Sequence, residues 1–228
     1  MIRRALVVGV VVATAALAEE LSWKRVLSSE GVRDARIVKV MDEVRRSDFL
    51  PESQRSHAME DRPLFIGHGQ TTSQPSLIAR MIQQARLERG CTVLEVGTGS
   101  GYQTALLARL CTHVYSIDIV GPLVVEAKQR LVKLGYVNMQ LKTGDGYLGW
   151  PEHGPFDAII VCASVSKVPQ PLLDQLKKGG RLVIPVGEPH DSQLQVFTKD
   201  DSGNVTKVNV LPVQFVPLTG ENADRDRN

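Results

Sequence analysis

The stretch Val93-Leu94-Glu95-Val96-Gly97-Thr98-Gly99-Ser100-Gly101-Tyr102 decides the fold of this chain. It begins as a short, largely apolar run, which is typical of a strand buried on both faces, and it continues into three glycines at alternate positions. Glycines let the backbone turn sharply and pass close to a ligand where a strand ends and a helix begins. The stretch therefore predicts a strand, a ligand-binding turn and a helix, in that order.

The residues that follow repeat this alternation of strand and helix. Short apolar runs predict strands at 92–96, 113–118, 139–143, 157–162 and 181–185. Apolar residues at helical spacing predict helices at 102–110, 123–134 and 171–177. Repeated strand–helix–strand units call for parallel strands joined by right-handed crossovers. The chain is therefore predicted to be an α/β protein with a doubly wound, mostly parallel sheet.

Further elements flank this core. Residues 34–46 and 77–85 show helical spacing and predict an N-terminal helical extension. Residues 52–76 have no clean period, so we expect an ordered loop there, and loops of this length are usually functional. Near the C-terminus, 193–198 and 205–215 predict a strand pair around a turn.

The length of the chain favours one domain. With 228 residues, of which 43% are apolar, the chain can bury one core. We predict a single domain over 19–220, with the N-terminal helices and loop at 19–85 and the α/β core at 86–220. The polar segment 221–228 is expected to be a flexible tail.

The composition limits the class of partner. The chain has 27 basic and 25 acidic residues, a net charge of +2, and no basic run, so we expect no nucleic-acid partner. Cys91, Cys111 and Cys162 lack the close pairing of a zinc site or a redox dithiol, and we interpret them as buried small apolar residues. The histidines have no metal-ligand spacing either, so no metal is expected. We expect a monomer.

Residues 1–18 follow the order of a secretory signal peptide. Arg3 and Arg4 precede an apolar stretch that ends in Ala16-Leu17-Ala18. This stretch is shorter than the roughly 20 residues that cross a bilayer as a helix. We therefore expect cleavage after Ala18, export, and no membrane span in the mature chain. The alternatives are an uncleaved anchor, a buried core helix and a misplaced start codon.

The glycine spacing separates two classes of nucleotide-binding turn. A dinucleotide-binding fingerprint needs G-x-G-x-x-G, but its last position would fall on Tyr102 or Thr104 here. The spacing is G-x-G-x-G, with Glu95 two residues before the first glycine, and it resembles motif I of the class I S-adenosylmethionine-dependent methyltransferases. The resemblance implies a Rossmann-like methyltransferase fold and S-adenosyl-L-methionine as the cofactor.

The same resemblance assigns the cofactor contacts. It places Asp118, which follows the second strand, at the ribose hydroxyls, and Asp145, after the third strand, beside the adenine amino group. Either acid could instead cap a helix or a turn. The expected cofactor-binding residues are Thr71, Thr72, Glu95, Gly97, Gly99, Ser100, Gly101, Asp118, Asp145, Gly146 and Thr219.

A second motif lies before the sheet. The segment Glu60-Asp61-Arg62-Pro63-Leu64-Phe65-Ile66-Gly67-His68-Gly69-Gln70-Thr71-Thr72-Ser73-Gln74-Pro75 resembles the signature loop of protein-L-isoaspartate O-methyltransferases. The resemblance continues in blocks to Thr219 and covers the chain from about Trp23. Met59 and Ser164 depart from the tyrosine and alanine that the family usually has at these positions. Both are expected near the peptide-binding cleft.

The resemblance implies methylation of the free carboxyl of L-isoaspartyl, and as further candidates D-aspartyl, residues in damaged proteins. The ester would collapse to a succinimide and so begin repair. An ionised carboxylate needs no general base. By resemblance Ser73 is the catalytic residue and orients the reactants by hydrogen bonding, although a serine there also suits a helix N-cap. Substrate contacts are expected from Met59, His68, Ala163, Ser164, Val216, Pro217 and Leu218.

Two other functions are weighed against this one. The departures at Met59 and Ser164 favour a methyltransferase of the same fold that acts on a small molecule or another protein group. Export favours a cofactor-binding protein that has lost catalysis, because S-adenosylmethionine is made in the cytoplasm. The presence of Ser73, Asp118 and Asp145 argues against such a loss. The family resemblance implies the cytoplasm, whereas residues 1–18 favour export.

Overall fold

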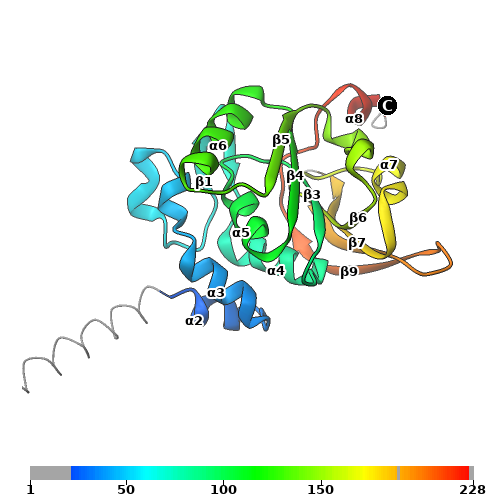
Figure 1. Ribbon diagram of the computed structural model, residues 1–228, viewed down its shortest axis with the longest axis horizontal. Helices are drawn as coiled ribbons and strands as arrows, with labels where there is room; N and C mark the ends of the chain where they lie inside the picture. The colour runs from blue at the N-terminus through cyan, green and yellow to red at the C-terminus, as the bar shows by residue number, and fades with distance from the viewer. Residues whose placement is uncertain (1–21, 189–190, 226–228) are drawn as a thin grey trace, which may run out of the picture.

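A seven-stranded sheet forms the centre of the molecule (Figure 1). The structure, a computed structural model, describes residues 22–188 and 191–225, so the signal-like segment 1–18 lies outside the described residues. The strands are β3 (Thr92–Val96), β4 (His113–Asp118), β5 (Met139–Thr143), β6 (Phe156–Val161), β7 (Leu176–Glu188), β8 (Asp191–Lys199) and β9 (Val205–Val213). Their order is β5-β4-β3-β6-β7-β8-β9, and all neighbours from β5 to β7 are parallel, whereas β8 and β9 are antiparallel. The predicted doubly wound, mostly parallel fold is confirmed.

Helices cover both faces of this sheet (Figure 1). They are α2 (Lys24–Ser29), α3 (Ala35–Glu43), α4 (Pro75–Ala85), α5 (Tyr102–Leu110), α6 (Gly121–Lys133), α7 (Gln170–Asp174) and α8 (Glu221–Arg225). Alternate residues of β3 point to opposite faces, so Val93 packs in the core built by α3, α4 and α5, while Leu94 packs in the core that contains α7. Burial on both faces explains why this strand reads as an apolar run. None of the described helices is long and apolar enough to cross a membrane.

The strand order creates a topological switch point. The chain leaves β3 toward β4 on one side, and β6 lies on the other side of β3. The helices that follow the two strands therefore diverge and leave a crevice at the carboxyl ends of β3 and β6. Ligands of open α/β sheets bind in such crevices.

The N-terminal part is more regular than predicted. The predicted loop at 52–76 holds the 3₁₀ helix η2 (Glu52–His57) and a small antiparallel sheet of β1 (Leu64–Gly67) and β2 (Gln70–Thr72). The turn between these strands has positive φ at Gly67, His68 and Gly69. Glycines favour this left-handed backbone conformation and so allow the tight turn. Because the segment has no alternation of apolar and polar residues, its sequence did not predict the two strands.

The C-terminus also differs from its prediction. Residues 221–225, expected in a flexible tail, form α8. The backbone and side-chain nitrogens of Asn222 each donate to Asp145 Oδ2 at 3.0 Å, and Ala223 is buried. A short polar segment is thus ordered by one distant carboxylate and one small apolar contact.

Two of the three cysteines are bonded to each other. Cys91 precedes β3 and Cys111 follows α5, and the two form a disulfide across 20 residues. Helix α5 runs back along the sheet and returns the chain to the start of β3, which brings the two residues together. Cys91 and Cys111 are buried as predicted, but their interpretation as unpaired residues is wrong. Cys162 has a free thiol and is partly buried.

Candidate active site

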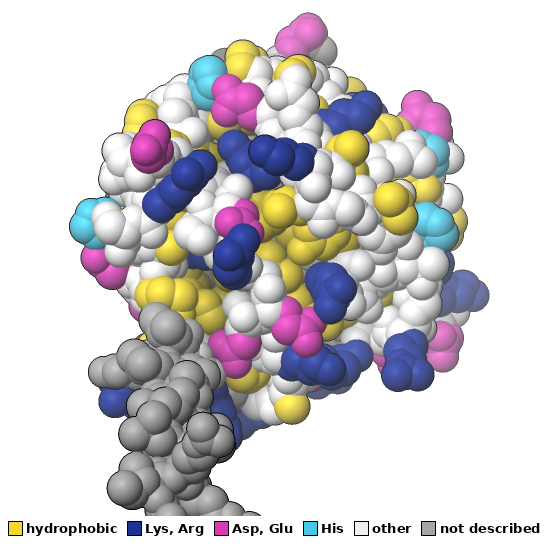
Figure 2. Space-filling view, turned by 60° about the vertical axis from the view of Figure 1, so that its left-hand side comes forward, with side chains coloured by type: hydrophobic (Ala, Val, Ile, Leu, Met, Phe, Trp, Pro, Cys, Tyr) yellow, Lys and Arg dark blue, Asp and Glu magenta, His cyan; other side chains and the backbone are white. Residues whose placement is uncertain are grey.

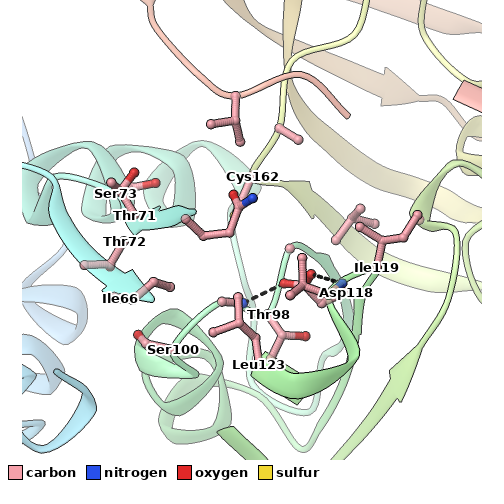
Figure 3. Close-up of a pocket in the computed structure, with 18 of the residues that line it drawn as sticks. Ile66, Thr71, Thr72, Ser73, Thr98, Ser100, Asp118, Ile119, Leu123 and Cys162 are labelled. Atoms are coloured by element: carbon pink, nitrogen blue, oxygen red, sulfur yellow. Dashed lines mark hydrogen bonds between the residues drawn. The ribbon is translucent and has the colours of Figure 1, made fainter. Parts of the chain in front are cut away.

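A cavity of about 300 Å³ occupies the crevice at the switch point (Figure 3). The turn after β3 forms one wall, and residues of β1 and β2 together with Ser73 form another. Thirteen of the residues predicted from the sequence line it together: Thr71, Thr72, Ser73, Gly97, Gly99, Ser100, Asp118, Gly146, Ala163, Val216, Pro217, Leu218 and Thr219. The fold therefore collects most of the predicted site into one space.

Glycine is required at two positions of the cavity wall. A Cβ on Gly97, whose φ is +103°, would lie 3.0 Å from Cβ of Cys162. A Cβ on Gly146 would lie 2.2 Å from Cγ1 of Val96. The backbone of both residues therefore faces the cavity without a side chain in the way. Gly101, predicted with them, instead packs against Ala127 and Leu131 of α6.

Asp118 ends β4 and holds the glycine turn. Its Oδ2 accepts a hydrogen bond from the Gly99 N–H at 2.8 Å, and its Oδ1 accepts from the Val120 N–H at 2.9 Å (Figure 3). Each carboxylate oxygen has a second lone pair, so Asp118 can also accept hydrogen bonds from two ligand hydroxyls. This matches the predicted contact with a ribose.

Glu95 lies beneath the cavity and not in its lining. Its Oε2 accepts from the hydroxyls of Thr104 at 2.5 Å and Ser116 at 2.6 Å, while Oε1 has no partner. The side chain is fully buried, and this burial raises the pKa of Glu95 to about 7. Glu95 therefore braces β3, α5 and β4 under the glycine turn.

Asp145 was predicted at the adenine, but its carboxylate is occupied elsewhere. It accepts from the Tyr147 N–H at 3.0 Å and from Asn222 of α8. Only its neighbour Gly146 lines the cavity. The alternative interpretation of this acid as a capping residue describes its contacts, because it caps the 3₁₀ turn η3 (Gly146–Leu148).

A second cavity, of about 760 Å³, adjoins the first. It lies between the signature loop, α4 and the segment that follows β9. Five residues line both cavities and so mark the junction: Thr71, Ser73, Cys162, Val216 and Pro217. A ligand in one cavity can therefore meet a ligand in the other beside Ser73.

The hydroxyl of Ser73 is not used by the fold. Gln74, and not Ser73, occupies the N-cap position of α4. The capping carboxylate comes from Asp61, whose Oδ1 accepts from the Ser76 N–H at 2.9 Å. Among the described residues the Ser73 hydroxyl has no hydrogen-bond partner, so it is free to bind a ligand in either cavity.

Arg46 fixes the loop that carries Ser73. Its guanidinium is buried and donates to the carbonyls of Ala58, Glu60, Arg62 and Ser73 at 3.0–3.4 Å. Burial lowers the pKa of Arg46 to about 10, so it stays charged at neutral pH. Sequence reasoning missed this residue because one arginine near a helix end carries no signal of burial.

Three predicted substrate residues lie apart from the cavity linings. Ser164 is buried, and its N–H and C=O bond to Val216 and Leu218 at 2.8 and 2.7 Å, so it fixes the C-terminal segment at the junction. His68 pairs with Glu126 of α6 at 3.1 Å, and Met59 is 43% exposed. Among the described residues, no group of three or more His, Cys, Asp or Glu could hold a metal ion.

Known proteins resemble this chain in sequence and in fold. Residues 16–223 match the family model described as protein-L-isoaspartate(D-aspartate) O-methyltransferase. The chain is 53% identical to protein-L-isoaspartate O-methyltransferase 2 of Polaromonas sp. over 82% of this chain and 90% of the relative. It is 50% identical to the Opitutus terrae enzyme of that name over 86% and 84%.

Solved structures agree with these relatives. A protein-L-isoaspartate O-methyltransferase superposes with a TM-score of 0.81 at 32% identity, over 92% of this chain and 69% of that chain. A structure described as a Plasmodium falciparum protein of the same activity, in complex with S-adenosyl-L-homocysteine, has a TM-score of 0.73 at 28% identity, over 90% and 97%. The chain belongs to the protein-L-isoaspartate(D-aspartate) O-methyltransferase family of class I S-adenosylmethionine-dependent methyltransferases.

Proposed function

We propose that the chain methylates the free carboxylate of L-isoaspartyl residues in damaged proteins at the junction beside Ser73. The observation that carries this proposal is that Thr71 and Ser73 line both the glycine-walled cavity and the larger cavity next to it. A reaction between a small cofactor and a polypeptide needs two adjoining compartments that align the reacting atoms. The methyl ester leads through a succinimide to repair.

The smaller cavity suits S-adenosyl-L-methionine. Its volume is at the lower end of the usual range for small-molecule sites. The glycine backbone would accommodate the methionine and ribose side of the cofactor, and the Asp118 carboxylate would hold the ribose hydroxyls. When bound, the cofactor supplies an electrophilic methyl group.

The chain's own residues orient the nucleophile and exclude water. An isoaspartyl carboxylate is ionised at neutral pH, so no side chain has to remove a proton. The free hydroxyl of Ser73 would donate a hydrogen bond that holds one carboxylate oxygen. Val216 and Pro217 cover the junction from the C-terminal side, and Ser164 holds them in place. A junction that excludes water favours transfer of the methyl group to the carboxylate over its transfer to water.

The larger cavity would take the damaged polypeptide. Its lining is mixed, with apolar residues of the segment after β9 and an ion pair between Arg80 and Glu30 at 3.5 Å. Asp191 is the other charged residue of the lining, which gives the lining a formal net charge of −1. We therefore expect at most a weak preference for basic neighbours of the damaged residue. Broad sequence acceptance suits an enzyme that repairs many proteins.

The test is transfer of labelled methyl to two peptides that differ only in an isoaspartyl or an aspartyl linkage. We expect base-labile methylation of the isoaspartyl peptide alone, and loss of at least 90% of it in Ser73→Ala. Ser202→Ala, an exposed serine in the β8–β9 turn, is the matched control and should keep full activity. Cofactor binding without transfer to either peptide would refute the proposal and favour another methyl acceptor.

Asp118 and Asp145 provide a second comparison. Asp118→Ala removes an acceptor at the cavity wall, and we expect the Kd of S-adenosylhomocysteine to rise about 100-fold, since two hydrogen bonds to a charged group are worth about 3 kcal/mol. Asp145→Ala should raise that Kd less than tenfold, because its carboxylate faces α8. Isothermal titration measures both values, and equal losses would contradict the assignment of Asp118 alone to the ribose.

We also propose that the protein is exported. Residues 1–18 have the order of a signal peptide, and the disulfide between Cys91 and Cys111 is a bond that persists in oxidising compartments. The two observations are independent of each other. An exported enzyme would need its cofactor supplied outside the cytoplasm, since the transferred methyl group must be replaced at every turnover.

Cell fractionation with mass spectrometry tests the export. The native protein should occur outside the cytoplasm with Glu19 as its first residue, and Cys91 and Cys111 should resist alkylation until a reductant is added. A cytoplasmic protein that starts at Met1 and has both thiols free would overturn this proposal and leave the methyltransferase activity untouched.

A further inference from the structure

A third cavity lies on a different side of the glycine turn. It has a volume of about 500 Å³ and is formed by the 3₁₀ helices η1 (Arg46–Phe49) and η2 together with α6. It shares no lining residue with the two cavities of the proposed active site. Its lining consists of Arg45, Ser47, Asp48, Arg55, Glu126, Gln129, Arg130, Lys133 and Leu134.

The acidic residues of this cavity already have partners. Asp48 pairs with Arg45 at 3.0 Å, and Glu126 pairs with His68 at 3.1 Å. Arg55, Arg130 and Lys133 form no ion pair within the described part of the chain. The cavity therefore contains three cationic groups that are available to an incoming anion.

Two of these cations repel each other. Arg130 is half-buried, and burial lowers its pKa; the charge of Glu126 opposes this shift, and the charge of Arg55 adds a smaller lowering. Arg55 and Arg130 use one donor each on the carbonyls of Leu50 and Ser100, and every guanidinium has five N–H donors. An oxyanion between them would remove the repulsion and accept the remaining hydrogen bonds.

We propose that this cavity binds an oxyanion of the phosphate class. Planar guanidinium groups match the paired oxygens of phosphate, and Lys133 adds a point charge at the same cavity. Asp48 and Glu126 line the same cavity, so its formal charge is only moderately positive. On the face shown in Figure 2, acidic side chains also lie among Lys and Arg, so that face has no continuous basic stripe for a polyanion.

The site is linked to the cofactor cavity through Arg130. The Nη1 of Arg130 donates to the Ser100 carbonyl at 2.7 Å, and Ser100 lines the cofactor cavity. An anion that holds Arg130 in place would also hold the glycine turn. Because coupling between two sites is reciprocal, phosphate should tighten cofactor binding and the cofactor should tighten phosphate binding by the same factor. This coupling, unlike the anion site itself, rests on the proposed function.

Titration of inorganic phosphate into the full chain at constant ionic strength, balanced with chloride, tests the site without methyl transfer. We expect saturable binding by calorimetry that weakens at least tenfold in Arg55→Gln and in Lys133→Gln. Lys128→Gln is the matched control, because Lys128 is exposed on the same helix but does not line the cavity. Non-saturable binding, or an equal loss in the Lys128 variant, would overturn the proposal.

Two further titrations define the ligand and the coupling. O-phosphoserine in place of inorganic phosphate distinguishes a phosphate carried on a larger molecule from the free ion, and failure of both to bind overturns the site. With 10 mM phosphate present, the Kd of S-adenosylhomocysteine should fall about fivefold in the native chain and stay constant in Arg55→Gln. An identical change in both proteins would overturn the coupling through Arg130.

Discussion

Arg46 is charged although it is almost completely buried, and its hydrogen bonds explain how the fold accommodates a buried charge. Its guanidinium donates to four backbone carbonyls on two segments of the loop, and one of these carbonyls belongs to Ser73. Backbone carbonyls buried without a donor are costly, so the arginine orders the loop by satisfying them. It acts as a positioning residue for Ser73.

The substitution Arg46→Lys tests this role. Lysine keeps the charge, but a single ammonium cannot reach carbonyls on both segments in the geometry of the guanidinium. We expect the free energy of unfolding to fall by about 2 kcal/mol, since hydrogen bonds to charged groups are each worth roughly 1.5–3 kcal/mol. The kcat should fall about tenfold while the Kd of S-adenosylhomocysteine stays constant. A variant that loses stability and keeps its kcat would contradict the positioning role.

Glu95 predicts a pH dependence of stability. Its pKa is about 7 in the folded protein, above the ordinary value of 4.5, because burial disfavours the charge. A raised carboxyl pKa means that the folded state binds the proton more tightly. The contribution of Glu95 to stability is therefore fully present below pH 4.5 and is lost as the pH rises through about 7. The shift corresponds to about 3 kcal/mol.

Urea unfolding of the chain without cofactor, at pH values from 5 to 8, measures this loss. In Glu95→Gln the carboxyl is absent and the decrease over this range should vanish, whereas the exposed control Glu88→Gln should keep it. A decrease of the same size in Glu95→Gln would show that another group titrates.

At the scale of elements, the sequence predicted the bounds of those helices and strands that have a regular hydrophobic periodicity. β3, β4, β5 and α5 have the bounds that apolar periodicity predicts, since each packs a regular face on the core. β7 extends from Leu176 to Glu188, beyond the predicted 181–185 on both sides. Antiparallel pairing with β8 continues to Glu188, and at the other end Leu176 pairs with Phe156 of β6. The sequence did not predict the β1–β2 sheet or α8. Contacts with distant residues stabilise these elements, and their own sequences show no hydrophobic periodicity.

The disulfide between Cys91 and Cys111 joins the start of β3 to the end of α5. Closing a loop of 20 residues reduces the entropy of the unfolded chain, which corresponds to about 3 kcal/mol of stability. The double variant Cys91→Ala/Cys111→Ala should lose about that much in a denaturant titration under non-reducing conditions. The native chain with dithiothreitol should match the variant. Equal stability of the native chain with and without reductant would indicate that the bond is absent in solution.

On the scale of the whole molecule, segments far apart in the sequence meet at the cofactor cavity. Thr71 to Ser73 come from the N-terminal part, and Val216 to Thr219 come from the C-terminal part. The sequence predicted the members of this site by resemblance to known motifs. It could not predict that Glu95, Asp145 and Ser164 support the cavity from outside its lining, because their roles depend on side-chain direction and on partners far along the chain.

This arrangement predicts how cofactor binding changes the whole chain. A ligand that contacts both segments should protect them together from amide hydrogen exchange, in 64–73 and 216–223, while the β8–β9 turn stays unchanged. At a ligand concentration 100 times Kd, S-adenosylhomocysteine should add about 2.7 kcal/mol to the free energy of unfolding. Protection confined to the glycine turn would contradict the joint closure of both segments.

The attachment of α8 to Asp145 has a practical consequence for laboratory work on this enzyme. An affinity tag placed directly after α8 would lie close to this contact, because Asn222 of α8 is hydrogen-bonded to Asp145, the residue next to Gly146 in the cavity wall. A tag on the N-terminus would be lost if the leader is cleaved. Purification handles are therefore best inserted in the exposed β8–β9 turn around Ser202, which lies in neither of the two active-site cavities.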